Sequence, residues 1–173
     1  MRTLLVFIFL TLSIPTHAQL VKSTQQDEIL DSQVNSLVFL LQDIYSQEYK
    51  PYRAVFDIPE NRKVVVFSIE SYYLGNNSYQ FLAVFRKSQR QETETSTPYG
   101  PITYKLLGYL QIGAHHMGSM NLDAMSYENN VLRIPLTPDR FSLTVINSEI
   151  INKALHSVTI KINEHSLKIV DMD

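Results

Sequence analysis

Three closely spaced, strand-like runs constrain the fold of this chain more than any other feature of the sequence. They span Lys63–Ile69, Tyr79–Phe85 and Tyr104–Ile112. Each is dense in β-branched and aromatic residues and is bounded by Asn, Gly, Pro or Ser. The second run is apolar on both faces, so it needs cover on both and is predicted to lie in the middle of a sheet.

One amphipathic helix is predicted before these strands, from about Asp27 to Gln47. Ser23 and Thr24 offer overlapping capping-box candidates at its start. Phe39 and Leu40 lie beside the main apolar stripe and widen it. We expect the helix to cover one face of the sheet; the alternative is a helix that binds a partner or dimerises. The apolar stripe itself comprises Leu30, Val34, Leu37, Val38, Leu41, Ile44 and Tyr45.

The remainder of the chain is predicted to be a β-meander. Glu128-Asn129-Asn130 is typical of a tight hairpin turn, and Asn163-Glu164-His165 joins two alternating runs in a terminal hairpin. A short helical turn is predicted over residues 147–154. Lys161 and Lys168 are expected on the outer face of the terminal hairpin, where they would protect a sheet edge. The predicted fold class is therefore α+β, an N-terminal helix on an antiparallel meander of about seven or eight strands. Its main variant is a sheet curled towards a barrel or sandwich.

The first eighteen residues have the pattern of a cleaved secretory signal peptide. Arg2 supplies the positive charge, residues 4–14 form an uncharged apolar run, and Thr16-His17-Ala18 precedes the expected cut. That apolar run is too short to span a bilayer, so no stable membrane insertion is expected after cleavage. The prediction is one domain over residues 19–173, exported to a periplasm or to the exterior, with a retained N-terminal anchor as the alternative.

Composition narrows the classes of function. The mature chain would have 173 − 18 = 155 residues, with 14 basic residues (15 minus Arg2) against 17 acidic ones. No block of like charge favours nucleic acid or an anionic membrane as a partner. With no Cys, the chain has no disulfide framework, thiol nucleophile or thiolate metal site, and an exported chain without Cys favours a bacterial origin.

Two polar connections are predicted to form the binding surface. The first joins two strands over residues 72–79 and sets tyrosines beside Gly and Asn, a composition typical of recognition loops. The second spans Lys87–Pro101, which is long for a compact domain and is predicted to be a hairpin loop. An alternative is that the tyrosines simply pack at strand ends. The candidate binding residues are Tyr72, Tyr73, Asn76, Asn77, Tyr79 and Tyr99.

A second candidate site follows the third strand. His115, His116, Met117 and Met120 offer imidazole and thioether ligands, which suit copper, with zinc as a further possibility for the histidines. Neighbouring residues of an extended chain point to opposite faces, so the two histidines could chelate one ion only at a bend. An ordinary turn with incidental histidines and a partly buried Met is the alternative interpretation.

Local catalytic signatures are absent from the sequence. It contains no Gly-x-Ser-x-Gly elbow, phosphate-cradling glycine loop, His-Glu-x-x-His or calcium loop. Asp57, Glu60 and Glu70 lie near predicted strand ends and could form a carboxylate site, although solvated termini explain them equally well. The leading hypothesis is a non-catalytic exported binding module for a protein or a small ligand, without a cofactor. The alternatives are a small exported hydrolase with a dispersed site and a copper or zinc carrier.

Overall fold

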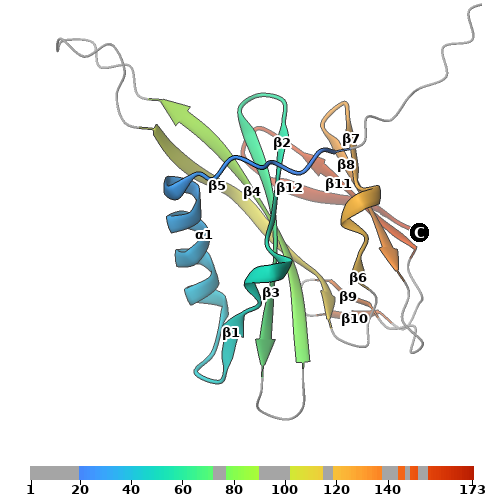
Figure 1. The fold of residues 1–173 in the computed structure, drawn as a ribbon. Coiled ribbons are helices and arrows are strands. Elements are labelled where there is room, and N and C mark those ends of the chain that lie inside the picture. The colour runs from blue at the N-terminus through green and yellow to red at the C-terminus, as the bar shows by residue number, and fades with distance from the viewer. Residues whose placement is uncertain are drawn as a thin grey trace, which may run out of the picture.

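A computed structural model describes residues 20–71, 77–89, 102–114, 119–137, 144–146, 149–151 and 156–173. Its first sheet is antiparallel and has the order β1-β3-β4-β5, with β2 pairing the free part of β3 (Figure 1). The three long central runs predicted from the sequence are β3, β4 and β5, each longer than expected. The strands of this sheet are β1 (Ser46–Glu48), β2 (Ala54–Ile58), β3 (Arg62–Ser71), β4 (Asn77–Gln89) and β5 (Ile102–Ala114).

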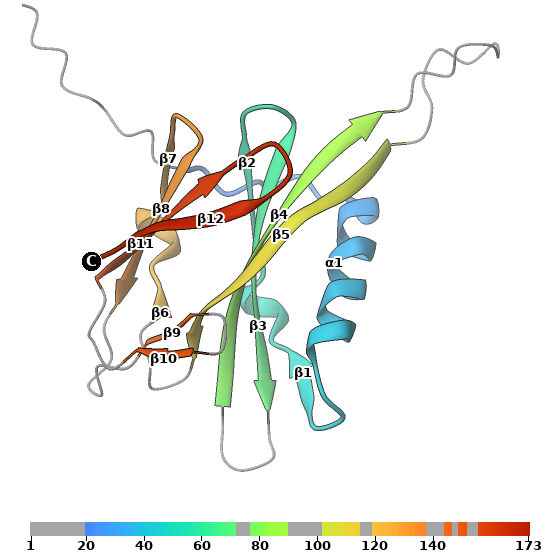
Figure 2. The ribbon, with the colours of Figure 1, turned by 180° about the vertical axis from the view of Figure 1, so that it is seen from behind.

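A second antiparallel sheet lies against the first, as the rear view in Figure 2 shows. Its order is β12-β11-β8-β6, with β7 also pairing β8. A separate two-stranded ribbon is formed by β9 and β10. The strands are β6 (Ser119–Met120), β7 (Ser126–Glu128), β8 (Val131–Thr137), β9 (Thr144–Ile146), β10 (Glu149–Ile151), β11 (Ser157–Ile162) and β12 (Leu167–Met172).

The single described α-helix, α1 (Glu28–Leu41), covers the other face of the first sheet. Its N-cap is Asp27, whose Oδ1 accepts a hydrogen bond from the Leu30 N–H at 3.1 Å. The capping-box candidates Ser23 and Thr24 are therefore wrong. Short 3₁₀ turns occur at η1 (Lys50–Tyr52) and η2 (Leu122–Ala124). No helix in the described ranges is both long and apolar enough to cross a bilayer.

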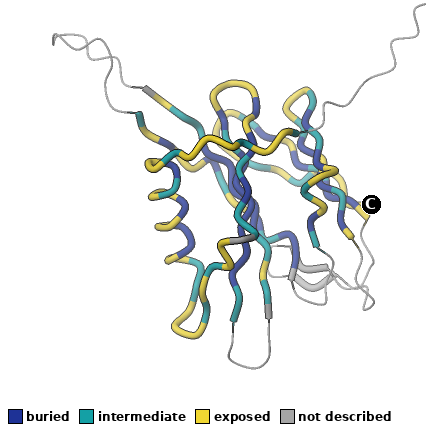
Figure 3. The backbone as a smooth tube through the Cα atoms, in the orientation of Figure 1, coloured by how far each residue is buried: buried dark blue, intermediate teal, exposed yellow. Residues whose placement is uncertain are grey.

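The layers are thus helix, sheet and sheet, with one apolar core on each side of the first sheet. Successive residues of β3 and β4 alternate between the two cores, which leaves β3 buried along most of its length and β4 buried over residues 81–85 (Figure 3). Phe67 and Phe81 stack beneath α1 with ring centroids 5.4 Å apart. On the opposite face, a Cβ on Gly108 would lie only 3.1 Å from Leu167 Cγ, so this glycine lets β12 approach β5 closely. The predicted mid-sheet position of the second run is confirmed, since β4 lies between β3 and β5.

Several details of the predicted fold differ from the structure. The helix ends at Leu41 and not near Gln47, and the described residues form twelve strands and not seven or eight. The two main sheets pack face to face without closing into a barrel. Residues 149–151, expected in a helical turn, form strand β10. The prediction of a mixed α+β fold with an antiparallel, sheet-rich core is confirmed.

Three hairpin turns lie at the same end of the two sheets (Figures 1 and 2). The β2–β3 turn uses positive φ at Glu60 and Asn61, and the β7–β8 turn does so at Asn129 and Asn130. The third turn joins β11 to β12 through residues 163–166. The tight turn predicted at Glu128-Asn129-Asn130 and the terminal hairpin are both confirmed. Lys161 pairs directly with Lys168, and β12 ends the strand order as predicted for a protected edge.

Candidate functional site

Large apolar side chains are concentrated on the surface where α1 ends and the chain turns into β1. Ile44 is 88% exposed, Leu40 78% and Phe39 73%, and the neighbouring Tyr45 is also exposed. Burying one such side chain is worth about 1.5–3 kcal/mol, so a cluster of exposed ones marks a surface that another molecule can cover. We call Phe39, Leu40, Ile44 and Tyr45 the α1–β1 surface.

Hydrogen bonds hold the tip of this surface in one conformation. Asp43 Oδ1 accepts from the Tyr45 N–H, and Ser46 Oγ accepts from the Asp43 N–H, both at 2.8 Å. The Ser46 hydroxyl also returns a bond to the Asp43 carbonyl at 3.3 Å. Ile44 is therefore displayed on an ordered turn, and binding through it would cost little conformational entropy.

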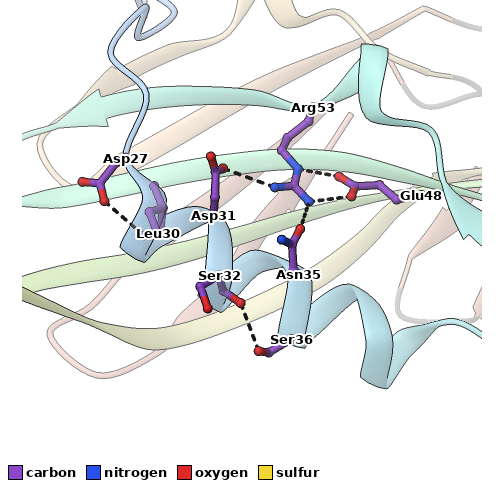
Figure 4. A network of polar contacts seen from close by, with 8 residues as sticks. All are labelled: Asp27, Leu30, Asp31, Ser32, Asn35, Ser36, Glu48 and Arg53. Carbon is purple, nitrogen blue, oxygen red and sulfur yellow. Dashed lines mark hydrogen bonds and ion pairs between the residues drawn. The ribbon is translucent and has the colours of Figure 1, made fainter.

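Arg53 fastens α1 to the sheet beside this turn (Figure 4). Its Nε and Nη2 donate to the two carboxylate oxygens of Glu48 in β1, each at 2.5 Å. Its Nη1 donates to Asp31 Oδ1 at 3.2 Å, and Nη2 also donates to Asn35 Oδ1 at 2.7 Å. Because the planar guanidinium binds α1 and β1 together, the helix that carries Phe39 and Leu40 has a fixed position.

A second polar link fixes the start of the helix. The Tyr104 hydroxyl on β5 donates to Asp27 Oδ2 at 2.5 Å. Burial alone would raise the pKa of Asp27, but the bonds from Tyr104 and the Leu30 N–H, with Lys87 and Lys63 nearby, leave it below its usual value. Burial, followed by the bond to Asp27, raises the pKa of Tyr104, so its hydroxyl remains a proton donor. The pair is suited to holding the helix and not to exchanging protons near neutral pH.

The segment that carries the α1–β1 surface is acidic. Residues 23–49 contain five acidic residues and no Lys or Arg. The last turn of α1 also lacks a basic residue. Arg53 offsets part of this charge through Asp31 and Glu48. An apolar surface on an acidic segment favours a partner with basic groups beside its apolar ones. The acidic residues are Asp27, Glu28, Asp31, Asp43 and Glu48.

The predicted recognition loop begins and ends beside this surface. Ser46, directly after Tyr45, pairs with Ser71, and Ser71 pairs with Asn77, so the segment 72–76 starts and ends next to the turn. Tyr79 pairs with Ile69 on β3 and is exposed. Of the predicted binding residues, the structure therefore brings Asn77 and Tyr79 into the neighbourhood of the α1–β1 surface. Tyr72, Tyr73, Asn76 and Tyr99 lie outside the described residues.

The predicted metal site is described at one residue. Met120 is buried between the sheets; its N–H donates to Gln80 Oε1 at 2.8 Å and its carbonyl accepts from the Tyr52 hydroxyl at 3.2 Å. His115, His116 and Met117 lie outside the described residues. Among the residues that the structure describes, no group of three or more His, Asp or Glu side chains is arranged to hold a metal ion.

Two of the three candidate carboxylates for catalysis are held in separate ion pairs. Asp57 pairs with Lys63, and Glu60 pairs with Arg62 at 3.0 Å. Two tyrosines elsewhere stay protonated: burial raises the pKa of Tyr52 to about 12, and burial also raises that of Tyr127 despite the opposing effect of Arg62. These arrangements serve as structural links, and nothing in them resembles a nucleophile activated by a base.

Two of the four residues of the α1–β1 surface were predicted to lie in a buried stripe. Ile44 and Tyr45 continue the helical spacing of the core residues, which suggested burial beneath a longer helix. The signal that could have corrected this is Asp43 with Ser46, since short polar side chains at this spacing bind nearby backbone groups in competition with helix hydrogen bonds. Phe39 and Leu40 were noted for widening the apolar face, and they are its exposed part.

No protein-family model, curated protein or solved structure matches this chain. We therefore infer function from geometry, burial and charge.

Proposed function

We propose that the chain is an exported, non-catalytic binding module that holds a partner protein on the α1–β1 surface. The observation that carries this proposal is Ile44, 88% exposed at the tip of a turn fixed by Asp43 and Ser46. An apolar anchor on an ordered turn loses little conformational entropy when it binds, because the turn is already fixed. Phe39, Leu40 and Tyr45 extend the anchor into a surface.

The acidic surroundings define the class of partner. We propose that it presents an apolar segment flanked by Lys or Arg, because five acidic residues and no basic one lie within residues 23–49. A second copy of this chain is a poorer occupant, since an isologous contact through this surface would bring two acidic sets together. An anionic membrane is disfavoured by the same charges.

The test starts from tagged mature protein, used for affinity purification from the extracytoplasmic fraction of its own cells. Binding of the purified partner is then measured by calorimetry for the parent, for Ile44→Ser and for Phe39→Ser. Hot-spot residues carry much of the affinity, so each variant should weaken binding about tenfold or more while the melting temperature stays the same. Val170→Ser is the matched control, because Val170 is also an exposed apolar residue but lies on β12.

Two further measurements decide between occupants. Affinity for a basic partner should fall as salt rises, because charge pairs at the rim are screened. Sedimentation of the parent and of Ile44→Ser checks for a dimer; a dimer that Ile44→Ser dissolves would contradict the partner proposal. Equal binding by Ile44→Ser, Phe39→Ser and the parent would reject this surface. Loss of binding in Tyr72→Ala/Tyr73→Ala/Tyr79→Ala alone would move the site to the predicted loop.

A further inference from the structure

A groove lined by several cationic residues lies where three hairpin turns gather, away from the α1–β1 surface. Figure 1 shows these turns at the opposite end of the molecule from β1. The groove forms where the β2–β3, β7–β8 and β11–β12 turns meet the end of β4. Four of its residues are cationic: Arg62, Arg86, Lys87 and Lys161. Lys87 alternates with Arg86 along β4 and its charge acts on Asp27 on the other face, so the positive charge of the groove is that of the remaining three. The carboxylates in the lining of the groove are those of Glu60 and Glu164.

The floor of the groove is a buried charge. Arg62 is 1% exposed, and its Nη2 donates to the Tyr127 hydroxyl at 2.9 Å and to Asn130 Oδ1 at 2.7 Å. Both acceptors are neutral. Its ion-pair partner Glu60 is 58% exposed, so water screens the carboxylate much more than the guanidinium. A buried cation with a solvated counter-ion leaves positive potential in the groove above it.

The cations are also aligned across the sheet. Arg62 on β3 pairs in register with Arg86 on β4, and Arg86 pairs with Lys105 on β5. Residues directly opposite one another project from the same face, and like charges in that arrangement destabilise a sheet. Arg86 has an ion pair with Glu164 at 3.6 Å, but that carboxylate is 74% exposed. Glu60 and Glu164 offset this repulsion only in part, because both carboxylates are largely exposed to water, and a bound anion would offset it further.

We propose that this groove binds a compact oxyanion with two negative charges, of the phosphate type, either free or as the terminal group of a larger ligand. Arg86 supplies a forked guanidinium that matches two oxygens of such a group, and Lys161 supplies a second charge from the facing hairpin. Arg62 supplies the field from below and holds the three turns in place. When the groove is occupied, the bound oxyanion replaces the exposed Glu164 as the counter-ion of Arg86.

The experiment is a titration of the folded chain with inorganic phosphate at constant ionic strength, followed by calorimetry and by backbone amide chemical shifts. Phosphate should bind and shift amides of the three turns, whereas acetate, with one charge, should bind much more weakly. Arg86→Gln and Lys161→Gln should each weaken phosphate binding about tenfold. Lys50→Gln, the same charge change at an exposed site beside β1, should leave it unchanged.

Glu164→Gln gives the sharpest result, because it removes the competing carboxylate and should tighten phosphate binding several-fold. A merely structural ion pair predicts no gain. Equal affinity for phosphate and acetate, no effect of Arg86→Gln, or weaker binding by Glu164→Gln would each overturn the proposal. Melting temperatures of the variants show whether any loss reflects unfolding.

Two ligand arms distinguish the source of the phosphate group. Glycerol phosphate tests a soluble phosphoester, and phosphatidylcholine vesicles with and without phosphatidic acid test a lipid headgroup. Binding in either arm that Arg86→Gln abolishes supports the groove and identifies the source. Absence of binding to inorganic phosphate and in both arms overturns it. Ile44→Ser should not affect any of these measurements, so this proposal and the partner-protein proposal fail independently.

Discussion

Two arginines, one at each end of this molecule, link the neighbouring elements by different chemistry. Arg53 joins α1 to β1 through the carboxylates of Glu48 and Asp31, and part of that cluster is open to water. Arg62 joins three hairpins through a hydroxyl, an amide oxygen and two backbone carbonyls, those of Pro59 and Ile162. The first cluster is ionic, and the second is a buried cation among mostly neutral acceptors.

The two clusters should therefore contribute differently to the stability of the fold. The Arg53–Glu48 pair is largely buried, but Asp31 is partly exposed, so solvent screens part of the energy of this cluster. A fully buried guanidinium has lost its hydration, and its hydrogen bonds must replace it; its removal also leaves acceptors without donors and a large space to fill. The helix end should therefore tolerate change better than the hairpin end, and the variants below test that ranking.

The largest effect is expected for Arg62→Ala. It empties the largest fully buried side-chain volume and removes donors from several acceptors, so the free energy of unfolding should fall by about 4 kcal/mol or more. Urea denaturation measures this. Arg62→Met should recover part of the loss, because a packed apolar side chain avoids the cost of a buried charge. If Arg62→Ala cost no more than Arg133→Ala, an exposed control on β8, the comparison would be wrong.

For Arg53→Ala the free energy of unfolding should fall by a smaller amount, about 2–3 kcal/mol. Shortening this side chain leaves Glu48 without its counter-ion, but it also opens the carboxylate to water. Adding Glu48→Gln should restore part of the stability, which a double-mutant cycle in urea would show. Adding Glu60→Gln to Arg62→Ala should restore little, since Glu60 is largely exposed. Equal recovery in the two cycles would contradict the distinction between the clusters.

The smallest effect, about 1–2 kcal/mol, is expected for Tyr104→Phe, and it should depend on pH. The folded pKa of Asp27 is depressed, so its stabilisation is complete above the ordinary Asp pKa and is lost as pH falls through the folded value. The difference in unfolding free energy between the parent and Tyr104→Phe should therefore be largest near neutral pH and shrink below about pH 4.

At alkaline pH the stability difference between the parent and Tyr104→Phe depends on the ionisation of Tyr104. The folded pKa of Tyr104 is raised, so its contribution is complete below the ordinary Tyr pKa and is lost as pH rises above about 10. Only the parent can lose that contribution, and the difference should narrow there too. Thermal melts between the two limits provide the measurement, and a difference independent of pH would show that the Tyr104 hydroxyl does not act through Asp27.

Long strands with a clear apolar pattern were predictable because burial on one or both faces leaves a pattern over many residues. This holds for β3, β4, β5, β8 and the β11–β12 hairpin. Strands of two or three residues, such as β1, β6 and β10, show no periodicity of their own and exist because a neighbour pairs with them. That accounts for the underestimated number of strands.

The candidate sites were less predictable, for two physical reasons. The exposure of Ile44 depends on where α1 ends, and side-chain bonds of Asp43 and Ser46 decide that against the helical spacing. The cationic groove depends on pairing between strands that are distant in sequence, since Arg62 and Arg86 meet only in the register of β3 and β4. The predicted tyrosine loop, by contrast, came from local composition, and its flanks Ser71 and Asn77 reach the α1–β1 surface.

Strands β3 and β4 belong to both apolar cores, because their alternate side chains enter one core or the other. Either core can lose its outer layer while β3 and β4 stay paired, but neither core survives the loss of these two strands. Amide protons in the middle of β3 and β4 should consequently exchange with deuterium only through global unfolding, whereas those of α1 and β12 exchange through smaller openings. A structural change at either proposed binding site would then reach the other chiefly through this shared pair of strands.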